Sequence, residues 1–73
     1  MTKLPQVSSR ECIKALERAG FYRVRRKGSH IVLHRKDPFA QTVVPERKTL
    51  GKGLLHAILR QAGLSVNDFL KLL

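Results

Sequence analysis

The chain has 73 residues, and this length leaves room for only one small hydrophobic core. Independent domains usually need on the order of 100 residues each, so two separate cores do not fit. A chain this short also buries only about 60% of the surface that its unfolded form exposes. We therefore expect residues 1–73 to form a single domain of modest stability.

The charge of the chain is extreme for this size. Lys and Arg together number 15 against 5 acidic residues, which gives a formal net charge of +10 and an isoelectric point near 11.0. Such an imbalance favours a polyanion or an acidic protein as the partner.

The sequence argues against a membrane or secreted protein. Apolar runs such as Ile31-Val32-Leu33 are far shorter than the roughly 20 residues that cross a bilayer. The first residues have neither an apolar stretch nor a small-residue cleavage site, so we expect a cytoplasmic protein. The lone Cys12 cannot form an internal disulfide, and its place on the apolar side of a helix predicts a buried residue rather than a nucleophile.

The pattern up to Pro45 predicts one helix and three strands. Ser8 and Glu11 have the spacing of a capping box, and Gly20 stands where a helix ends. Gly28 and the serine after it form a turn between two segments rich in β-formers. We expect a helix over about Ser9–Ala19 and strands over Phe21–Arg26, His30–Arg35 and Gln41–Val44.

The C-terminal part predicts two more helices. After a polar connection over Glu46–Lys52, apolar residues from Leu54 onward recur at helical spacing until Gly63 closes the helix. Ser65 then repeats the pattern of a helix start, so a short third helix ends the chain. The residues from Met1 to about Leu4 are expected to fray.

These elements predict an α+β fold. A three-stranded antiparallel sheet this small is not stable alone, so both amphipathic helices must pack on one of its faces. The other face stays open to solvent, and function is expected on it or at its edge. Alternation along the second strand puts Ile31 and Leu33 under the helices and His30, Val32 and His34 on the open face.

His30 is the strongest candidate for chemistry on this open face. It directly follows the glycine turn, where a ligand can approach, and an imidazole exchanges protons near neutral pH. On spacing alone, however, an ordinary surface histidine is the better interpretation. His34 lies four residues further along the strand, roughly 13 Å away, so the two cannot share one metal or one proton. His56 is expected to flank the apolar stripe of the second helix or to face solvent.

The sequence predicts no metal and no small-molecule cofactor. It has no Cys-x-x-Cys pair and no His-x-x-x-His pair on a helix, and its five acidic residues are dispersed. Gly51-Lys52-Gly53 lacks the Ser or Thr and the preceding strand of a phosphate loop, so we interpret it as a helix-start loop.

Basic side chains are concentrated beside the hairpin and in the loop before the second helix. They are Arg23, Arg25, Arg26, Lys27, Arg35, Lys36, Arg47, Lys48 and Lys52. A run of charged residues is usually just a solvent-exposed surface. Here, however, the basic side chains and a helix N-terminus together could bind phosphates. Such binding depends on salt and tolerates many sequences. Tyr22 and Phe39 are the outward candidates for stacking on bases, and either fits the core equally well.

Four motifs follow one another at characteristic spacings: Ala19-Gly20-Phe21, Lys27-Gly28-Ser29-His30, Val43-Val44-Pro45 and the stretch from Leu55 to Ser65. Together they resemble the HicA toxins of bacterial type II toxin–antitoxin modules over nearly the whole chain. The resemblance implies a double-stranded-RNA-binding-domain-like fold with α-β-β-β-α order, in agreement with the order expected from pattern. It also implies an mRNA interferase, a ribonuclease that arrests translation.

The resemblance further implies a site and a partner. The histidine of the Gly-Ser-His motif carries the chemistry in that family, and here it is His30. Metal-free RNA cleavage needs a group that moves a proton and cations that stabilise the developing negative charge. We expect Arg25, Lys27 and Lys36 to supply that charge, and Ser29 and Lys52 to bind RNA as well. The implied partner is an acidic HicB-type antitoxin that forms a hetero-oligomer with the toxin and covers its active face.

Two other functions stay open at this point. A non-catalytic RNA-binding module of the same fold would bind duplex RNA by its shape, with His30 incidental. A small interaction protein would use its basic surface only to dock an acidic partner.

Overall fold

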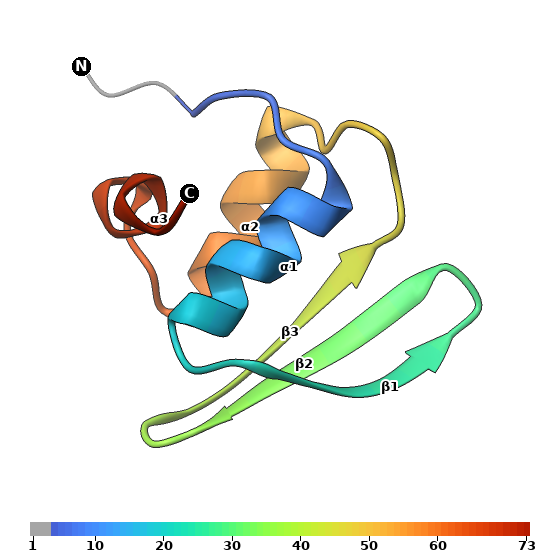
Figure 1. The fold of residues 1–73 in the computed structure, drawn as a ribbon, viewed down its shortest axis with the longest axis vertical. Coiled ribbons are helices and arrows are strands. Elements are labelled where there is room, and N and C mark those ends of the chain that lie inside the picture. The colour runs from blue at the N-terminus through green and yellow to red at the C-terminus, as the bar shows by residue number, and fades with distance from the viewer. Residues whose placement is uncertain (1–3) are drawn as a thin grey trace.

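The computed structural model describes residues 4–73, which form a three-stranded sheet with helices on one of its sides (Figure 1). The elements are α1 (Ser9–Arg18), β1 (Tyr22–Lys27), β2 (His30–Lys36), β3 (Phe39–Pro45), α2 (Lys52–Ala62) and α3 (Val66–Leu72). The strands are antiparallel and lie in the order β1-β2-β3. This confirms the expected α+β fold with its helix, three strands and following helices. Within residues 4–73, no helix combines the length and the apolar character needed to span a bilayer.

Side-chain caps set the starts of α1 and α3, as predicted. The Glu11 N–H donates to Ser8 Oγ at 3.1 Å, and the Ser8 N–H donates to the Glu11 carboxylate at 2.9 Å. Ser65 and Asp68 form the same reciprocal pair at α3, with distances of 3.2 and 3.0 Å. The hydrogen bonds from the Ser65 backbone and hydroxyl lower the pKa of the Asp68 carboxyl. Both helices therefore begin at a serine whose neighbour three residues on is acidic.

All three strands and α2 extend beyond their predicted bounds, β1 and β2 by one residue each at their C-terminal ends. β3 runs from Phe39 to Pro45, because the ladder with β2 continues to the pair His30 and Pro45. Proline can close a ladder at a strand end, where its missing N–H is not needed. α2 already begins at Lys52, since Gly51 is its extended N-cap residue.

The hydrophobic core lies between the helices and the inner face of the sheet. Its fully buried side chains include Ile13, Leu16, Leu33, Leu50, Leu55, Ile58 and Phe69. The buried Thr42 of β3 satisfies its hydroxyl there, 3.0 Å from Gln61 Oε1 and 3.3 Å from the Ile58 carbonyl oxygen. Leu4, expected to fray, is instead buried in this core, and residues 1–3 lie outside the described part of the chain.

Arg35 at the far end of β2 ties the sheet to two helix ends. Its guanidinium lies 4.9 Å from the ring centre of Phe21, and its Nε donates to the Pro38 carbonyl at 3.0 Å. The chain passes Arg35 at Gly20 and Gly63, which follow the ends of α1 and α2 and have φ of +97° and +72°. A Cβ atom at either glycine would come within 3.7 Å of the arginine side chain. Arg35 is thus a structural residue rather than one of the free cations beside the hairpin.

The two helix glycines Gly63 and Gly53 predict opposite effects of the same substitution. Gly63→Ala forces an L-residue into the left-handed region, and we expect it to lower the free energy of unfolding by about 1 kcal/mol. Gly53 lies inside α2, where an added Cβ atom would meet nothing within 4 Å, so Gly53→Ala should raise that free energy by about 0.5 kcal/mol. Urea unfolding of both variants checks the signs, and equal effects would contradict the assignment of Gly63 as a left-handed cap.

Candidate active site

The sheet has one covered face and one open face. Ile31 and Leu33 of β2 belong to the core, whereas the exposed His30 lies on the other side of the strand. Val32 shares that other side, and although it is only 7% exposed it is not part of the core cluster. Its cross-strand neighbours Arg25 and Val43 lie on the same face and shield it. The predicted division of β2 between the two faces is confirmed.

A β-bulge in β1 decides which residue of this strand lies opposite His34. Arg23 pairs with Leu33 and Arg25 pairs with Val32, so Val24 is an extra residue in the strand. Without it, strict alternation would put Tyr22 and Arg26 on one face. With it, Tyr22 lies opposite His34 on the face of Arg25 and Lys27, and Arg26 lies on the other face. The sequence pattern alone did not reveal this shift.

Residues that pair across the three strands form rows on the open face. From the turn outward, these rows are Lys27, His30 and Pro45; Arg25, Val32 and Val43; Tyr22, His34 and Gln41; and Lys36 and Phe39. Lys27 is therefore directly opposite His30, at the distance of about 5 Å between Cβ atoms that is usual for such pairs. Arg25 is in the next row. An exposed imidazole beside two cations can move protons next to a bound phosphate.

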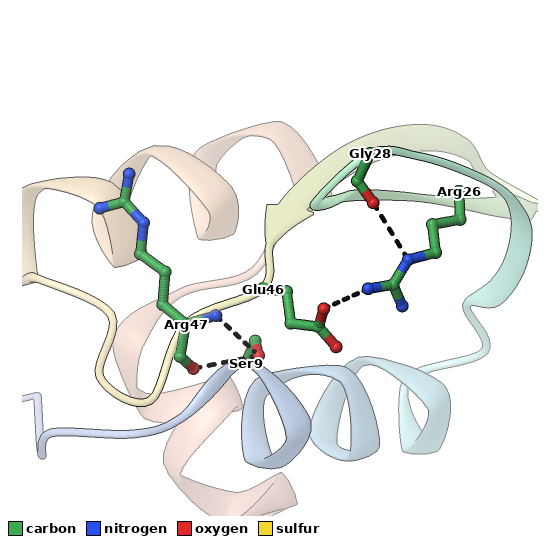
Figure 2. Close-up of polar contacts among 5 residues, drawn as sticks. All are labelled: Ser9, Arg26, Gly28, Glu46 and Arg47. Atoms are coloured by element: carbon green, nitrogen blue, oxygen red, sulfur yellow. Dashed lines mark hydrogen bonds and ion pairs between the residues drawn. The ribbon is translucent and has the colours of Figure 1, made fainter.

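Arg26 stabilises the turn that precedes His30 (Figure 2). Arg26 Nε donates to the Gly28 carbonyl at 3.0 Å, and its NH2 group pairs with the Glu46 carboxylate. The Glu46 N–H in turn donates to the Ser29 carbonyl at 2.6 Å. Gly28 has φ +60°, which a tight turn requires, and Ser29 is exposed. Arg26 and Glu46 thus fix the backbone immediately before His30, a role that the sequence analysis missed.

The loop after β3 is fastened to the start of α1 and leads away from His30. Ser9 donates through its N–H and its hydroxyl to the Arg47 carbonyl at 3.0 and 3.1 Å, and the Arg47 N–H lies 3.1 Å from Ser9 Oγ (Figure 2). The Leu50 N–H then donates to the Val7 carbonyl at 2.8 Å. This path puts Lys52 at the start of α2, within the helix layer. Lys52 is therefore not brought into the row of His30.

Lys36 shares the open face with His30 but lies at the other end of β2. Six residues separate them, which corresponds to roughly 20 Å along a strand. Of the predicted site residues, the structure thus brings Arg25, Lys27 and Ser29 next to His30 and puts Lys36 at the other end of the strand, whereas Lys52 is not part of the sheet and begins α2.

The other candidate groups do not form a second centre of chemistry. Cys12 is buried, and desolvation raises the pKa of its thiol from 9.0 to about 12, so it is an inert core residue as predicted. His56 is exposed on α2, as expected. Within residues 4–73, no three His, Cys, Asp or Glu side chains come together as metal ligands would. A surface pocket between the N-terminal segment, α1 and Leu73 is lined by no residue of the sheet.

Comparison with known proteins bears on this site. A family model described as the HicA toxin of bacterial toxin–antitoxin matches residues 9–64, which include the whole sheet, α1 and α2. A search of curated proteins finds no match.

The geometry of the turn predicts that two adjacent arginines differ in their contribution to stability. Lysine cannot reproduce the two directed contacts of Arg26, so Arg26→Lys should lower the free energy of unfolding. Because the side chains of Arg26 and Glu46 are both half exposed, we expect a loss of only about 1 kcal/mol. Arg25→Lys keeps the charge and an apolar stem over Val32, and should change it by less than about 0.3 kcal/mol. Denaturant unfolding compares the pair, and equal losses would contradict the role of the Arg26 contacts in holding the turn.

Proposed function

Because the chain belongs to the HicA toxin family of bacterial toxin–antitoxin modules, we propose that it is an endoribonuclease that cleaves mRNA without a metal ion and so arrests translation. The observation that carries this proposal is the exposed imidazole of His30 on the open face, directly opposite Lys27 and one row from Arg25. His30 is the proposed catalytic residue.

The proposed reaction is a transesterification at one phosphate of the RNA. The 2′-oxygen of one nucleotide attacks the adjacent phosphorus, and the bond to the 5′-oxygen of the next nucleotide breaks. His30 takes the proton from the 2′-hydroxyl and returns it to the departing 5′-oxygen, so one group acts first as base and then as acid. Such proton transfer contributes typically 10²–10⁴-fold to a rate. An exposed position in a fixed turn suits it, because RNA can reach the imidazole from solvent.

The cations take two proposed roles. Lys27 and Arg25 flank His30 and stabilise the negative charge that grows on the phosphate oxygens in the transition state. Ser29 supplies a hydroxyl beside the same phosphate. Lys36, at the other end of β2, lies too far from His30 for that role and binds a phosphate elsewhere on the RNA, and Lys52 binds a phosphate from the start of α2.

The partner of the toxin is its antitoxin, and we propose that this is an acidic HicB-type protein that forms a hetero-oligomer by covering the open face. None of the strand residues on this face in β1, β2 or β3 is acidic, whereas Arg25, Lys27 and Lys36 all lie on it. Complementary charge speeds the encounter of such partners and excludes neutral ones. An antitoxin on this face would block both RNA binding and access to His30.

The proposal predicts that cleavage depends on His30 and not on a metal ion. Purified protein incubated with a single-stranded mRNA in excess EDTA should cleave it, and His30→Ala should lose at least about 100-fold in rate. His56→Ala is the matched control, since it removes an exposed histidine on α2 and should leave the rate unchanged.

Two readouts separate catalysis from the alternatives. His30→Ala should keep the native far-ultraviolet circular dichroism and its affinity for the antitoxin. Salt-sensitive RNA binding without cleavage by the unaltered protein would instead select a non-catalytic RNA-binding module.

A further inference from the structure

The aromatic residues of this chain are divided between the core and the open face. Phe21 and Phe69 are buried, whereas Phe39 is 69% and Tyr22 42% exposed. Burying a phenylalanine in place of exposing it stabilises a protein by roughly 1.5–3 kcal/mol, and so small a chain has few apolar residues to spare. The exposure of Phe39 is therefore not explained by folding and suggests a ligand.

Tyr22, His34 and Phe39 form one cluster at the end of the open face away from the Gly28 turn. The His34 ring lies between the others, with ring centres 6.4 Å from Tyr22 and 5.4 Å from Phe39, both edge to face at 72° and 69°. His34 Nε2 lies 2.8 Å from Gln41 Oε1, and because an amide oxygen only accepts, that nitrogen carries a hydrogen. We call these three rings the aromatic platform. Its central ring is fixed in orientation and its outer rings are free on the solvent side.

A cation accompanies the most exposed ring of the aromatic platform. Lys36 is the cross-strand partner of Phe39, so an ammonium group and a phenyl ring project together from the same row of the open face. This combination suits a nucleotide, whose base stacks on an aromatic ring while its phosphate meets a positive charge. An acidic protein segment would use the lysine but would gain little from a row of rings. The pairing therefore favours nucleic acid as the occupant.

We propose that the aromatic platform binds an unpaired base of the RNA and that the protein selects single-stranded RNA by this contact. The inference rests on the proposed function, because His30 and His34 lie on the same face of β2, roughly 13 Å apart. A strand of RNA that crosses the open face would meet His30 at one of its phosphates and the aromatic platform a short way along. Bases in a duplex are stacked on their neighbours and cannot reach the rings.

A single tryptophan provides the test, because the chain has none of its own. Phe39→Trp puts the only indole on the aromatic platform, and stacking of a base should quench its fluorescence. The probes are a mixed-sequence oligoribonucleotide with methylated 2′-oxygens, which cannot attack phosphorus, and a duplex of the same length. We expect quenching by the single strand and none by the duplex. Leu73→Trp, at the exposed chain end, is the control and should respond to neither.

Affinity measured by fluorescence anisotropy completes the test. Phe39→Leu removes the ring and should weaken binding of the single strand about 5- to 100-fold, while Phe39→Tyr should restore it to within about threefold. Duplex binding should be the same for all three proteins. Unchanged single-strand affinity in Phe39→Leu would overturn the inference, as would a loss confined to antitoxin binding, which would assign the aromatic platform to a protein partner.

The outcome for the aromatic platform is independent of the outcome for cleavage. Suppose that the unaltered protein cleaves mRNA in EDTA and that the Phe39→Leu variant binds RNA normally. This result would support the proposed function and contradict base binding at the aromatic platform. If RNA quenches the tryptophan fluorescence at position 39 but the protein does not cleave RNA, base binding at the aromatic platform is supported and the catalytic role of His30 is contradicted.

Discussion

The structure depends on the fact that this chain can cover only one face of its sheet. Two helices, α1 and α2, pack against the inner face, and together with α3 they enclose the core (Figure 1). Nothing in residues 4–73 covers the other face, so Val32 is protected there only by the side chains beside it. The residues on that face contribute little to the core, and their chemistry is therefore free to serve binding. The position of His30, the flanking cations and the exposed rings all follow from this one-sided packing.

The hairpin turn and a single extra residue in β1 together give the open face its chemical character. The two-residue turn pairs Lys27 with His30, so alternation puts Arg25 and Lys27 on the face of His30 and Arg26 on the other, where it can hold the turn together with Glu46. The bulge at Val24 then brings Tyr22 to the open face, opposite His34. The turn thus sets the cations of the candidate site, and the bulge adds a ring beside His34. The other end of the molecule has a comparable device in Arg35, which fills the space left by Gly20 and Gly63. The positive φ of both glycines explains why a glycine stands just beyond each of the two long helices.

Local patterns in the sequence were sufficient to predict the order of elements. Capping boxes, apolar spacing and the glycine turn are short-range signals, and each was confirmed in the structure. Alternation along β2 also predicted the faces of Ile31, Leu33, His30 and His34. It was not applied to β1, and it could not have given the face of Tyr22, because a bulge depends on how two strands pair and leaves no clear mark in either one. The roles of Arg26, Glu46 and Arg35 were missed for a similar reason, since their partners are distant in the sequence or lie in the backbone.

The central claim is that RNA crosses the open face of the sheet with a phosphate at His30. It is tested most directly by nuclear magnetic resonance of the labelled protein titrated with the 2′-methylated single strand, following side-chain signals of arginine and histidine. The account predicts that the His30 ring and the Arg25 guanidinium shift at the lowest RNA concentrations, while Arg10 and Arg18 on α1 do not. Shifts concentrated on α1 and around the pocket beside Leu73, with His30 unaffected, would contradict it.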